Sequence, residues 1–189
     1  MHNNHKLIAI VGLTGSGKTE ATRFFELVGF SIIRFGDLTD DYLKENNLER
    51  NEHNERRARE FLRKKHGMEA YAKLNLQKIE ELLQQNNLVI DGLYSWEEFK
   101  FLKNIFSKHF MIIALYAPPE LRHFRLTNRL QRPLTKEEAV ERDYSEIEHL
   151  NKAGPIAFAD CTIINTATLI DLKQNVQQVI KTVMDQEII

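Results

Sequence analysis

The chain has 189 residues, of which 42% are hydrophobic and 28% charged, values that exclude a disordered chain and fit one globular domain. Its 26 Lys and Arg side chains are balanced by 27 Asp and Glu, so the net charge of -1 gives no reason to expect a nucleic acid polymer or a membrane surface as partner. Cys161 is the single cysteine, no apolar run is long enough to span a bilayer, and the start of the chain has no signal-peptide pattern. We expect a cytoplasmic protein, and composition leaves its oligomeric state open.

The first predicted element is a buried strand at 7–11, which runs directly into Gly-Leu-Thr-Gly-Ser-Gly-Lys-Thr at 12–19. Residues 12–19 match the phosphate-binding loop (P-loop) pattern G-x-x-x-x-G-K-[ST] at every fixed position, and an amphipathic helix follows over 18–28. In such a loop backbone N–H groups bind phosphate oxygens, the lysine reaches the β- and γ-phosphates, and the final hydroxyl binds Mg²⁺. We therefore expect ATP and Mg²⁺ as ligands. The predicted nucleotide-binding residues are Gly12, Thr14, Gly15, Ser16, Gly17, Lys18 and Thr19, with Thr19 also a ligand for the metal.

A second strand, predicted at 31–35, leads to Gly36-Asp37 and a long polar segment. Ligands of parallel sheets bind beyond the carboxyl ends of the strands, so Asp37 is a candidate to act on a phosphoryl acceptor. The alternative is that it caps the next helix. The segment 38–86 is helical in pattern and rich in arginine, and we expect an inserted helical subdomain that holds the acceptor, with Arg56 and Arg57 as phosphate-binding candidates. A merely solvated helix is the alternative.

The third predicted strand, 88–91, ends in Asp91, which is placed to support Mg²⁺ directly or through water; a solvent-facing carboxylate is the alternative. Ser95 with Glu98 forms a capping-box signature that predicts a helix over 96–106. Thr135 with Glu138 forms a second capping-box signature, which predicts the start of another helix.

Between a fourth strand at 110–116 and this second capping box lies a predicted helix with three arginines. Arg122, Arg125 and Arg129 are spaced i, i+3 and i+7, which places all three on one face of that helix. The three positive charges would repel one another unless they met anions, and they would stabilise the negative charge on a phosphoryl group in transfer. The alternative is a basic helix face that only contacts solvent. We expect 122–150 to form a lid.

A fifth strand at 161–165 and a helix at 169–184 complete the pattern, in which strands alternate with helices throughout. This alternation predicts an α/β fold with one parallel sheet covered on both faces. We expect a single domain spanning 1–189.

These motifs resemble the nucleoside-monophosphate-kinase branch of P-loop proteins, within it adenylate-kinase-related and dephospho-CoA-kinase-like proteins, over nearly the whole chain. Gly36-Asp37 and Ile90-Asp91-Gly92 resemble the Gly-Asp and Asp-Gly of adenylate kinases, whereas the C-terminal half is closer to dephospho-CoA kinases. The resemblance implies a three-layer α/β/α P-loop kinase with a five-stranded parallel sheet, a lid that closes over the γ-phosphoryl group, and an adenine site after the last strand. The residues it assigns are Lys18, Arg125, Arg129 and Arg142 at the transferring phosphoryl, Asn165 and Thr166 beside the adenine, and Asp37 and Gly92 beside the acceptor.

Two departures leave the acceptor open. Adenylate kinases carry an arginine soon after the Gly-Asp and another after the Asp-Gly, where this chain has Leu38 and Leu93-Tyr94. Other arginines would have to hold an acceptor phosphate. The leading hypothesis is ATP-dependent phosphoryl transfer to a nucleoside monophosphate. The alternatives are a dephospho-CoA kinase, whose hydroxyl acceptor calls for a base such as Asp37, and a nucleotide-binding regulator or partner-dependent ATPase.

Overall fold

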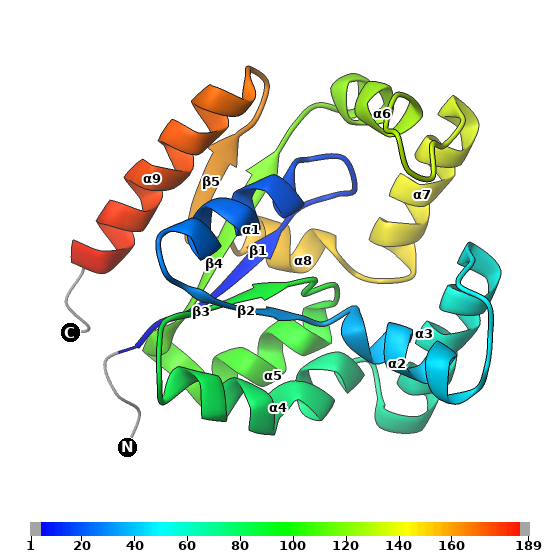
Figure 1. Cartoon of the computed structure of the whole chain (residues 1–189), viewed down its shortest axis with the longest axis horizontal. Helices are drawn as coiled ribbons and strands as arrows, with labels where there is room; N and C mark the ends of the chain where they lie inside the picture. The colour runs from blue at the N-terminus through cyan, green and yellow to red at the C-terminus, as the bar shows by residue number, and fades with distance from the viewer. Residues whose placement is uncertain (1–4, 186–189) are drawn as a thin grey trace.

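The fold is a single parallel β-sheet between two layers of helices (Figure 1). The computed structural model describes residues 5–185, so the first and last four residues of the expected 1–189 domain lie outside the described residues. The strands lie in the order β2-β3-β1-β4-β5 and all pair in parallel, which confirms the predicted sheet. The strands are β1 (Leu7–Val11), β2 (Ser31–Arg34), β3 (Leu88–Asp91), β4 (Phe110–Tyr116) and β5 (Cys161–Ile164).

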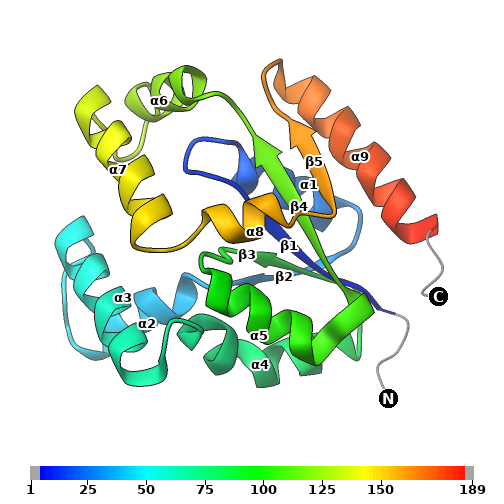
Figure 2. The ribbon, with the colours of Figure 1, turned by 180° about the vertical axis from the view of Figure 1, so that it is seen from behind.

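Each face of the sheet is covered by its own helices, as the views from the front and from behind show (Figures 1 and 2). Side chains of β1 alternate between the two resulting cores: Leu7 belongs to one and Ile8 to the other. Because both faces are buried, β1 is apolar at every position. One face packs against α1 (Lys18–Leu27) and α9 (Leu169–Asp185), and the other against α4 (Ala70–Leu83), α5 (Trp96–Phe106) and α8 (Ala153–Ala157).

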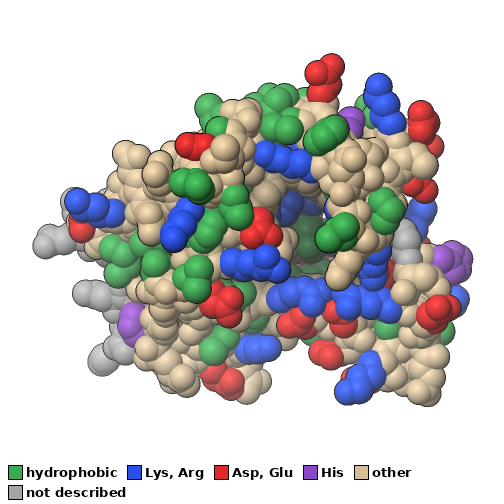
Figure 3. Space-filling model, turned by 45° about the horizontal axis from the view of Figure 1, so that its top comes forward, with side chains coloured by type: hydrophobic (Ala, Val, Ile, Leu, Met, Phe, Trp, Pro, Cys, Tyr) green, Lys and Arg blue, Asp and Glu red, His purple; other side chains and the backbone are tan. Residues whose placement is uncertain are grey.

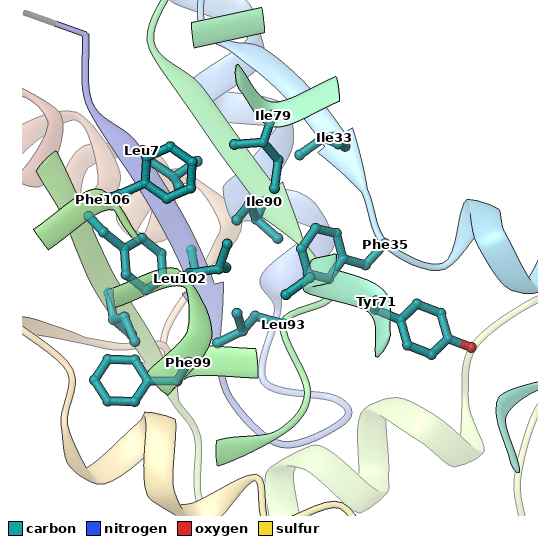
Figure 4. Close-up of a cluster of buried hydrophobic side chains, with 14 of the residues drawn as sticks. Leu7, Ile33, Phe35, Tyr71, Ile79, Ile90, Leu93, Phe99, Leu102 and Phe106 are labelled. Atoms are coloured by element: carbon teal, nitrogen blue, oxygen red, sulfur yellow. The ribbon is translucent and has the colours of Figure 1, made fainter. Parts of the chain in front are cut away.

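The core on the α4 and α5 face is the larger one and contains many aromatic rings (Figure 4). Tyr71 of this core points its hydroxyl away from the other rings and hydrogen-bonds the Thr39 hydroxyl at 2.6 Å (Figure 4). That bond ties α2 (Asp37–Glu45) to the body of the domain.

The polar segment between β2 and β3 divides into two parts. Helices α2 and α3 (Glu52–His66) extend to one side of the sheet, whereas α4 lies on the sheet, with Ile79 fully buried (Figure 1). The projecting part is therefore shorter than the insertion expected over 38–86, because the apolar face of α4 makes it the crossover helix to β3.

The expected lid consists of α6 (Pro119–Thr127) and α7 (Lys136–Glu148), which lie beside the P-loop. The prediction that Arg129 shares a helix face with Arg122 and Arg125 is wrong, because α6 ends before it. Asn128 ends the helix: its backbone N–H and its side-chain amide both donate to the Phe124 carbonyl, at 3.1 and 2.8 Å.

All five carboxyl ends of the strands face the same edge of the sheet, and the P-loop, α2 and α6 follow three of them. The functional residues predicted from widely separated motifs therefore share one end of the molecule. A short 3₁₀ turn, η1 (Ser107–His109), lies at the opposite end, before β4. Within residues 5–185, no helix has the length and apolarity needed to cross a membrane.

Candidate functional site

The P-loop connects β1 to α1 and depends on glycines with left-handed backbones. Gly15 has φ of 86° and Gly17, the N-cap of α1, has φ of 100°. Both are also in close contact with other elements: a Cβ at Gly15 would lie 2.8 Å from the Arg122 carbonyl oxygen, and one at Gly17 would overlap the Asn165 amide. The loop is thus held between α6 and the residue after β5, with its N–H groups at the start of a helix, where anions bind.

A small pocket lies at the Gly17 end of the P-loop. Asn165 donates to the Ser16 carbonyl at 2.8 Å, and Arg125 donates to the Asn165 carbonyl at 3.0 Å and the Gly15 carbonyl at 3.4 Å. Arg125 therefore lies on the pocket side of the loop, and Thr166 is exposed beside it. The pocket has a volume of about 280 Å³ and is lined by Gly17, Arg125, Asn165, Ala167, Leu169 and Leu172.

Lys18 lies partly buried in the loop, with its Nζ donating to the Leu13 carbonyl at 3.1 Å. Burial, together with the positive charge of Lys152, lowers the pKa of Lys18 to about 7. The negative charges of Glu146 and Asp91 act to raise this pKa. An incoming phosphate would favour the charged ammonium form and raise this pKa again.

Asp91 ends β3, directly beside β1 in the register of the sheet. Burial raises its pKa, while the charges of Lys18 and Arg34 act to lower it. Thr19 is exposed on the first turn of α1. A hydroxyl, a carboxylate and phosphate oxygens are hard oxygen donors that suit Mg²⁺, so Thr19 and Asp91 fit the expected metal.

Helices α6 and α7, the expected lid, are joined to the P-loop through Arg122, which is 3% exposed. Its guanidinium forms a bidentate pair with Asp143 of α7, at 2.6 and 2.7 Å, and donates to the Thr14 carbonyl at 3.2 Å. His123 lies 2.8 Å from the same carboxylate. Arg122 therefore positions the lid, whereas the sequence grouped it with the arginines that face an anion.

A second connection between lid and loop comes from Glu146 of α7, whose carboxylate accepts from the Thr14 N–H at 3.0 Å and from the Thr14 hydroxyl. Arg142 lies 3.4 Å from that hydroxyl oxygen and 3.6 Å from Glu146. Lys152, in the turn after α7, pairs with Glu146 at 2.8 Å. Sequence reasoning missed Glu146 and Lys152, because neither belongs to a recognisable spacing pattern.

Of the three lid arginines assigned from the sequence, the structure brings Arg125 and Arg142 to the P-loop. Arg129 lies in the loop after α6 and donates to the Arg132 carbonyl.

On the far side of Asp91, β2 and α2 form a cluster of charges that the sequence did not reveal. Arg34, at the end of β2, donates to Asp37 and Asp40 at 3.0 Å each, and Arg50 reaches Asp40 at 3.2 Å. The capping alternative for Asp37 is wrong: Gly36 is the N-cap of α2, and the Asp37 carboxylate instead accepts from Arg34.

Glu55 of α3 extends this cluster toward the lid. It pairs with Arg50 at 3.3 Å, Arg59 at 3.7 Å and Arg132 at 2.8 Å. Burial alone would raise the pKa of Glu55, but the hydrogen bonds from Arg132 and Arg50 outweigh burial and lower it. We call Arg34, Arg50, Arg59, Arg132, Asp40 and Glu55 the arginine cluster.

The acceptor candidates assigned from the sequence divide into two groups. Arg56 and Arg57 are exposed on α3, where Arg56 pairs with Glu60 at 2.8 Å, while Arg59 turns inward. Gly92 is buried after Asp91 with φ of 102°, and a Cβ there would lie 3.0 Å from the Tyr94 hydroxyl. Figure 3 shows a hollow at this end of the molecule with Lys and Arg side chains gathered around it.

Comparison with known proteins identifies the family. The family model described as "AAA domain" matches residues 8–149. A UPF0200 protein of Sulfurisphaera tokodaii is 34% identical over 95% of this chain and 98% of its own length. The chain belongs to the UPF0200 family. Another member, from Thermococcus onnurineus, is 30% identical over 94% of this chain and 98% of its own.

Solved structures similar to this UPF0200 chain share its fold at low sequence identity. TT1252 from Thermus thermophilus has a TM-score of 0.63 at 18% identity, covering 95% of this chain and 98% of its own. Shikimate kinase from Acinetobacter baumannii has a TM-score of 0.58 at 21% identity, covering 96% of each chain. A gluconokinase from Sinorhizobium meliloti has a TM-score of 0.56 at 10% identity, covering 95% of each chain. The chain therefore has a P-loop kinase-like fold, and the nucleoside-monophosphate-kinase branch stays a prediction.

Proposed function

We propose that this UPF0200 protein transfers the γ-phosphoryl group of ATP to a small nucleotide-type acceptor, in the first place a nucleoside monophosphate. The proposal depends most on one observation. Lys18 and Asp91 lie between the pocket at Gly17 and the arginine cluster. The loop therefore has a cavity on one side and a cationic surface on the other.

The donor half follows from the P-loop. ATP would place its base and ribose near Arg125 and Asn165 and its phosphates along residues 12–19, with Lys18 at the β- and γ-phosphates. Mg²⁺ would be held by Thr19 and, through water, by Asp91, and when bound it neutralises charge on the phosphate oxygens. Arg142, already within reach of Thr14, would contribute further positive charge.

The acceptor half rests on the arginine cluster. The bond between the γ-phosphorus and its bridging oxygen to the β-phosphate breaks, and a bond to an acceptor oxygen forms, leaving ADP. A monophosphate offers an oxygen that is already anionic, so it needs alignment and charge neutralisation and no general base. Arg34 and Arg50 are suited to this because guanidinium groups bind phosphate bidentately. Asp40 and Glu55 hold the arginines in place before the acceptor arrives.

A hydroxyl acceptor such as that of dephospho-CoA is the second candidate. It requires a carboxylate to take the hydroxyl proton, and Asp37, which accepts from Arg34, lies beside the cluster. Similarity in fold to shikimate kinase adds shikimate, a hydroxyl acceptor that is not a nucleotide, to the compounds to be tested. Asp37→Asn separates the candidates: it slows the chemical step by about 100-fold for a hydroxyl acceptor and leaves kcat for a monophosphate nearly unchanged.

The experiment is an acceptor panel with ATP and Mg²⁺: AMP, GMP, CMP, UMP, dephospho-CoA, shikimate and gluconate, with ADP and phosphorylated product separated by chromatography. Stoichiometric formation of a nucleoside diphosphate supports the proposal. Lys18→Ala should abolish turnover, and Lys173→Ala, an exposed lysine on α9, is the matched control. ADP release that no acceptor stimulates would contradict the proposal and favour a regulator or partner-dependent ATPase. The Arg132–Glu55 pair, which links lid and α3, is the feature such a regulator would use.

A further inference from the structure

The carboxylate of Glu146 occupies a place in the P-loop that a phosphate oxygen would take. Glu146 is 4% exposed, and its two oxygens accept from the N–H and the hydroxyl of Thr14, at the centre of the loop. Backbone N–H groups of this loop type bind phosphate oxygens. Glu146 is thus an internal anion at the phosphate site, and it marks where a bound anion is stabilised.

The cations around this carboxylate are the ones a phosphoryl group would meet. Arg142 Nε lies 3.6 Å from Glu146, and Lys18 is close enough that the two charges shift each other's pKa. Burial alone would raise the pKa of Glu146, but Lys152 and Lys18 outweigh it and hold the value at about 2, so the carboxylate is ionised. Lys18 and Arg142 were expected here from the sequence; Lys152 was not.

Lys152 is held at this point by the fold. It is 3% exposed, its Nζ lies 2.8 Å from Glu146, and its backbone N–H donates to the Glu146 carbonyl at 3.1 Å. The same Nζ lies 4.6 Å from the centroid of the Tyr94 ring, on the side of the loop where Asp91 ends β3. A buried ammonium group is costly to keep without an anion beside it.

The direction of the phosphate chain identifies which phosphoryl group would reach Lys152. The pocket lies at Gly17, at the start of α1, whereas Glu146 binds Thr14, three residues earlier in the loop. A nucleotide with its base in that pocket extends its phosphates from Gly17 past Lys18, so the terminal phosphoryl group comes nearest to Glu146.

We propose that Lys152 binds the γ-phosphoryl group of ATP, which replaces the Glu146 carboxylate at the P-loop and takes over its contact with the lysine. The inference rests on the proposed function only in taking ATP as the donor. Because ADP ends before this position, Lys152 favours ATP over ADP, and Glu146 acts against ATP more than against ADP.

The test is equilibrium binding of ADP and of a non-hydrolysable β,γ-imido analogue of ATP, each with Mg²⁺, by calorimetry. Two variants are compared: Glu146→Gln and the double variant Glu146→Gln/Lys152→Met. Both lack the buried carboxylate, and they differ only in the lysine. Glu146→Gln leaves the buried Lys152 ammonium without its anion until a phosphoryl group binds. Thermal unfolding of both variants checks that they fold.

Glu146→Gln should raise the affinity for the ATP analogue more than that for ADP. Adding Lys152→Met should then lower the ratio of the two affinities by ~10-fold or more, as expected for a lost charge-assisted hydrogen bond. An unchanged ratio between the two variants would overturn the proposal, because a lysine that only neutralises Glu146 has no role once the carboxylate is gone. Lys173→Met controls for loss of a distant positive charge. If the wild-type protein binds the analogue but phosphorylates no acceptor, the proposed function fails while the affinity ratio still decides the role of Lys152.

Discussion

Arg122 and Asp143 form a partly buried bidentate ion pair, at 2.6 and 2.7 Å, that joins α6 to α7. Arg122 also donates to the Thr14 carbonyl, so a single guanidinium connects α6, α7 and the P-loop. This guanidinium therefore holds α6 and α7 against the loop.

Arg122→Met should destabilise the protein by about 3 kcal/mol, because it leaves Asp143 partly buried without its strongest partner. Urea denaturation measures the change. Arg23→Met is the control, since Arg23 lies exposed on α1 with a surface partner, Glu20, and its loss should cost less than about 1 kcal/mol. Equal losses in the two variants would mean that the Arg122 pair does not hold the lid.

Gly17→Ala and Gly29→Ala separate backbone strain from close contact. The two backbones are alike, with φ of 100° at Gly17 and 97° at Gly29. A Cβ at Gly17, however, would overlap the Asn165 amide, whereas one at Gly29 would meet nothing within 4 Å. Gly29→Ala should cost about 1 kcal/mol of stability, from the left-handed backbone alone, and leave ATP affinity intact. Gly17→Ala should cost more and also weaken ATP binding, since Asn165 must leave Ser16. Similar effects on ATP affinity would show that the Gly17–Asn165 contact is not needed.

The pKa of Lys18, about 7 without ligand, makes nucleotide binding depend on pH. At pH 8 the ligand-free lysine is largely neutral, and phosphate binding favours its charged form, so binding takes up protons and ATP affinity falls between pH 7 and pH 9. Calorimetry in buffers with different ionisation enthalpies measures this uptake. Lys18→Arg keeps its charge throughout this range, so its uptake should be smaller; equal uptake in both proteins would assign the proton to another group.

Arg34→Ala tests the arginine cluster. Because Arg34 lies next to Asp37 and Asp40 and not in the P-loop, its loss should raise KM for the acceptor by ~10-fold or more and leave the KM for ATP unchanged. Arg56→Ala, measured in the same assay, tests the expectation from sequence that Arg56 binds the acceptor phosphate. An unaffected acceptor KM in Arg34→Ala would move the acceptor away from the cluster.

The features that could be predicted from sequence are those encoded by neighbouring residues. The P-loop, the five strands and the two capping boxes, Ser95 with Glu98 and Thr135 with Glu138, each depend on residues within one short stretch, and all are present in the structure.

The features that escaped prediction depend on contacts between distant segments. Glu146 reaches Thr14 across 132 residues of chain, and Arg132 reaches Glu55 across 77, so no local spacing reveals either pair. No sequence pattern singles out Arg34, because it lies within a predicted strand and its contacts depend on how α2 turns its carboxylates back toward β2. Arg129 was misplaced because the Asn128 cap, and not helical periodicity, decides where α6 ends.

The central claim is that the γ-phosphoryl group leaves ATP for a small nucleotide-type acceptor bound beside the arginine cluster. The most direct measurement follows ATP labelled in the γ-phosphate, with Mg²⁺ and each nucleoside monophosphate in turn. The account predicts that the label appears in a nucleoside diphosphate, that Lys18→Ala abolishes this transfer, and that Arg34→Ala slows it at low acceptor concentration. Label found only in inorganic phosphate, at a rate that no acceptor changes, would contradict it.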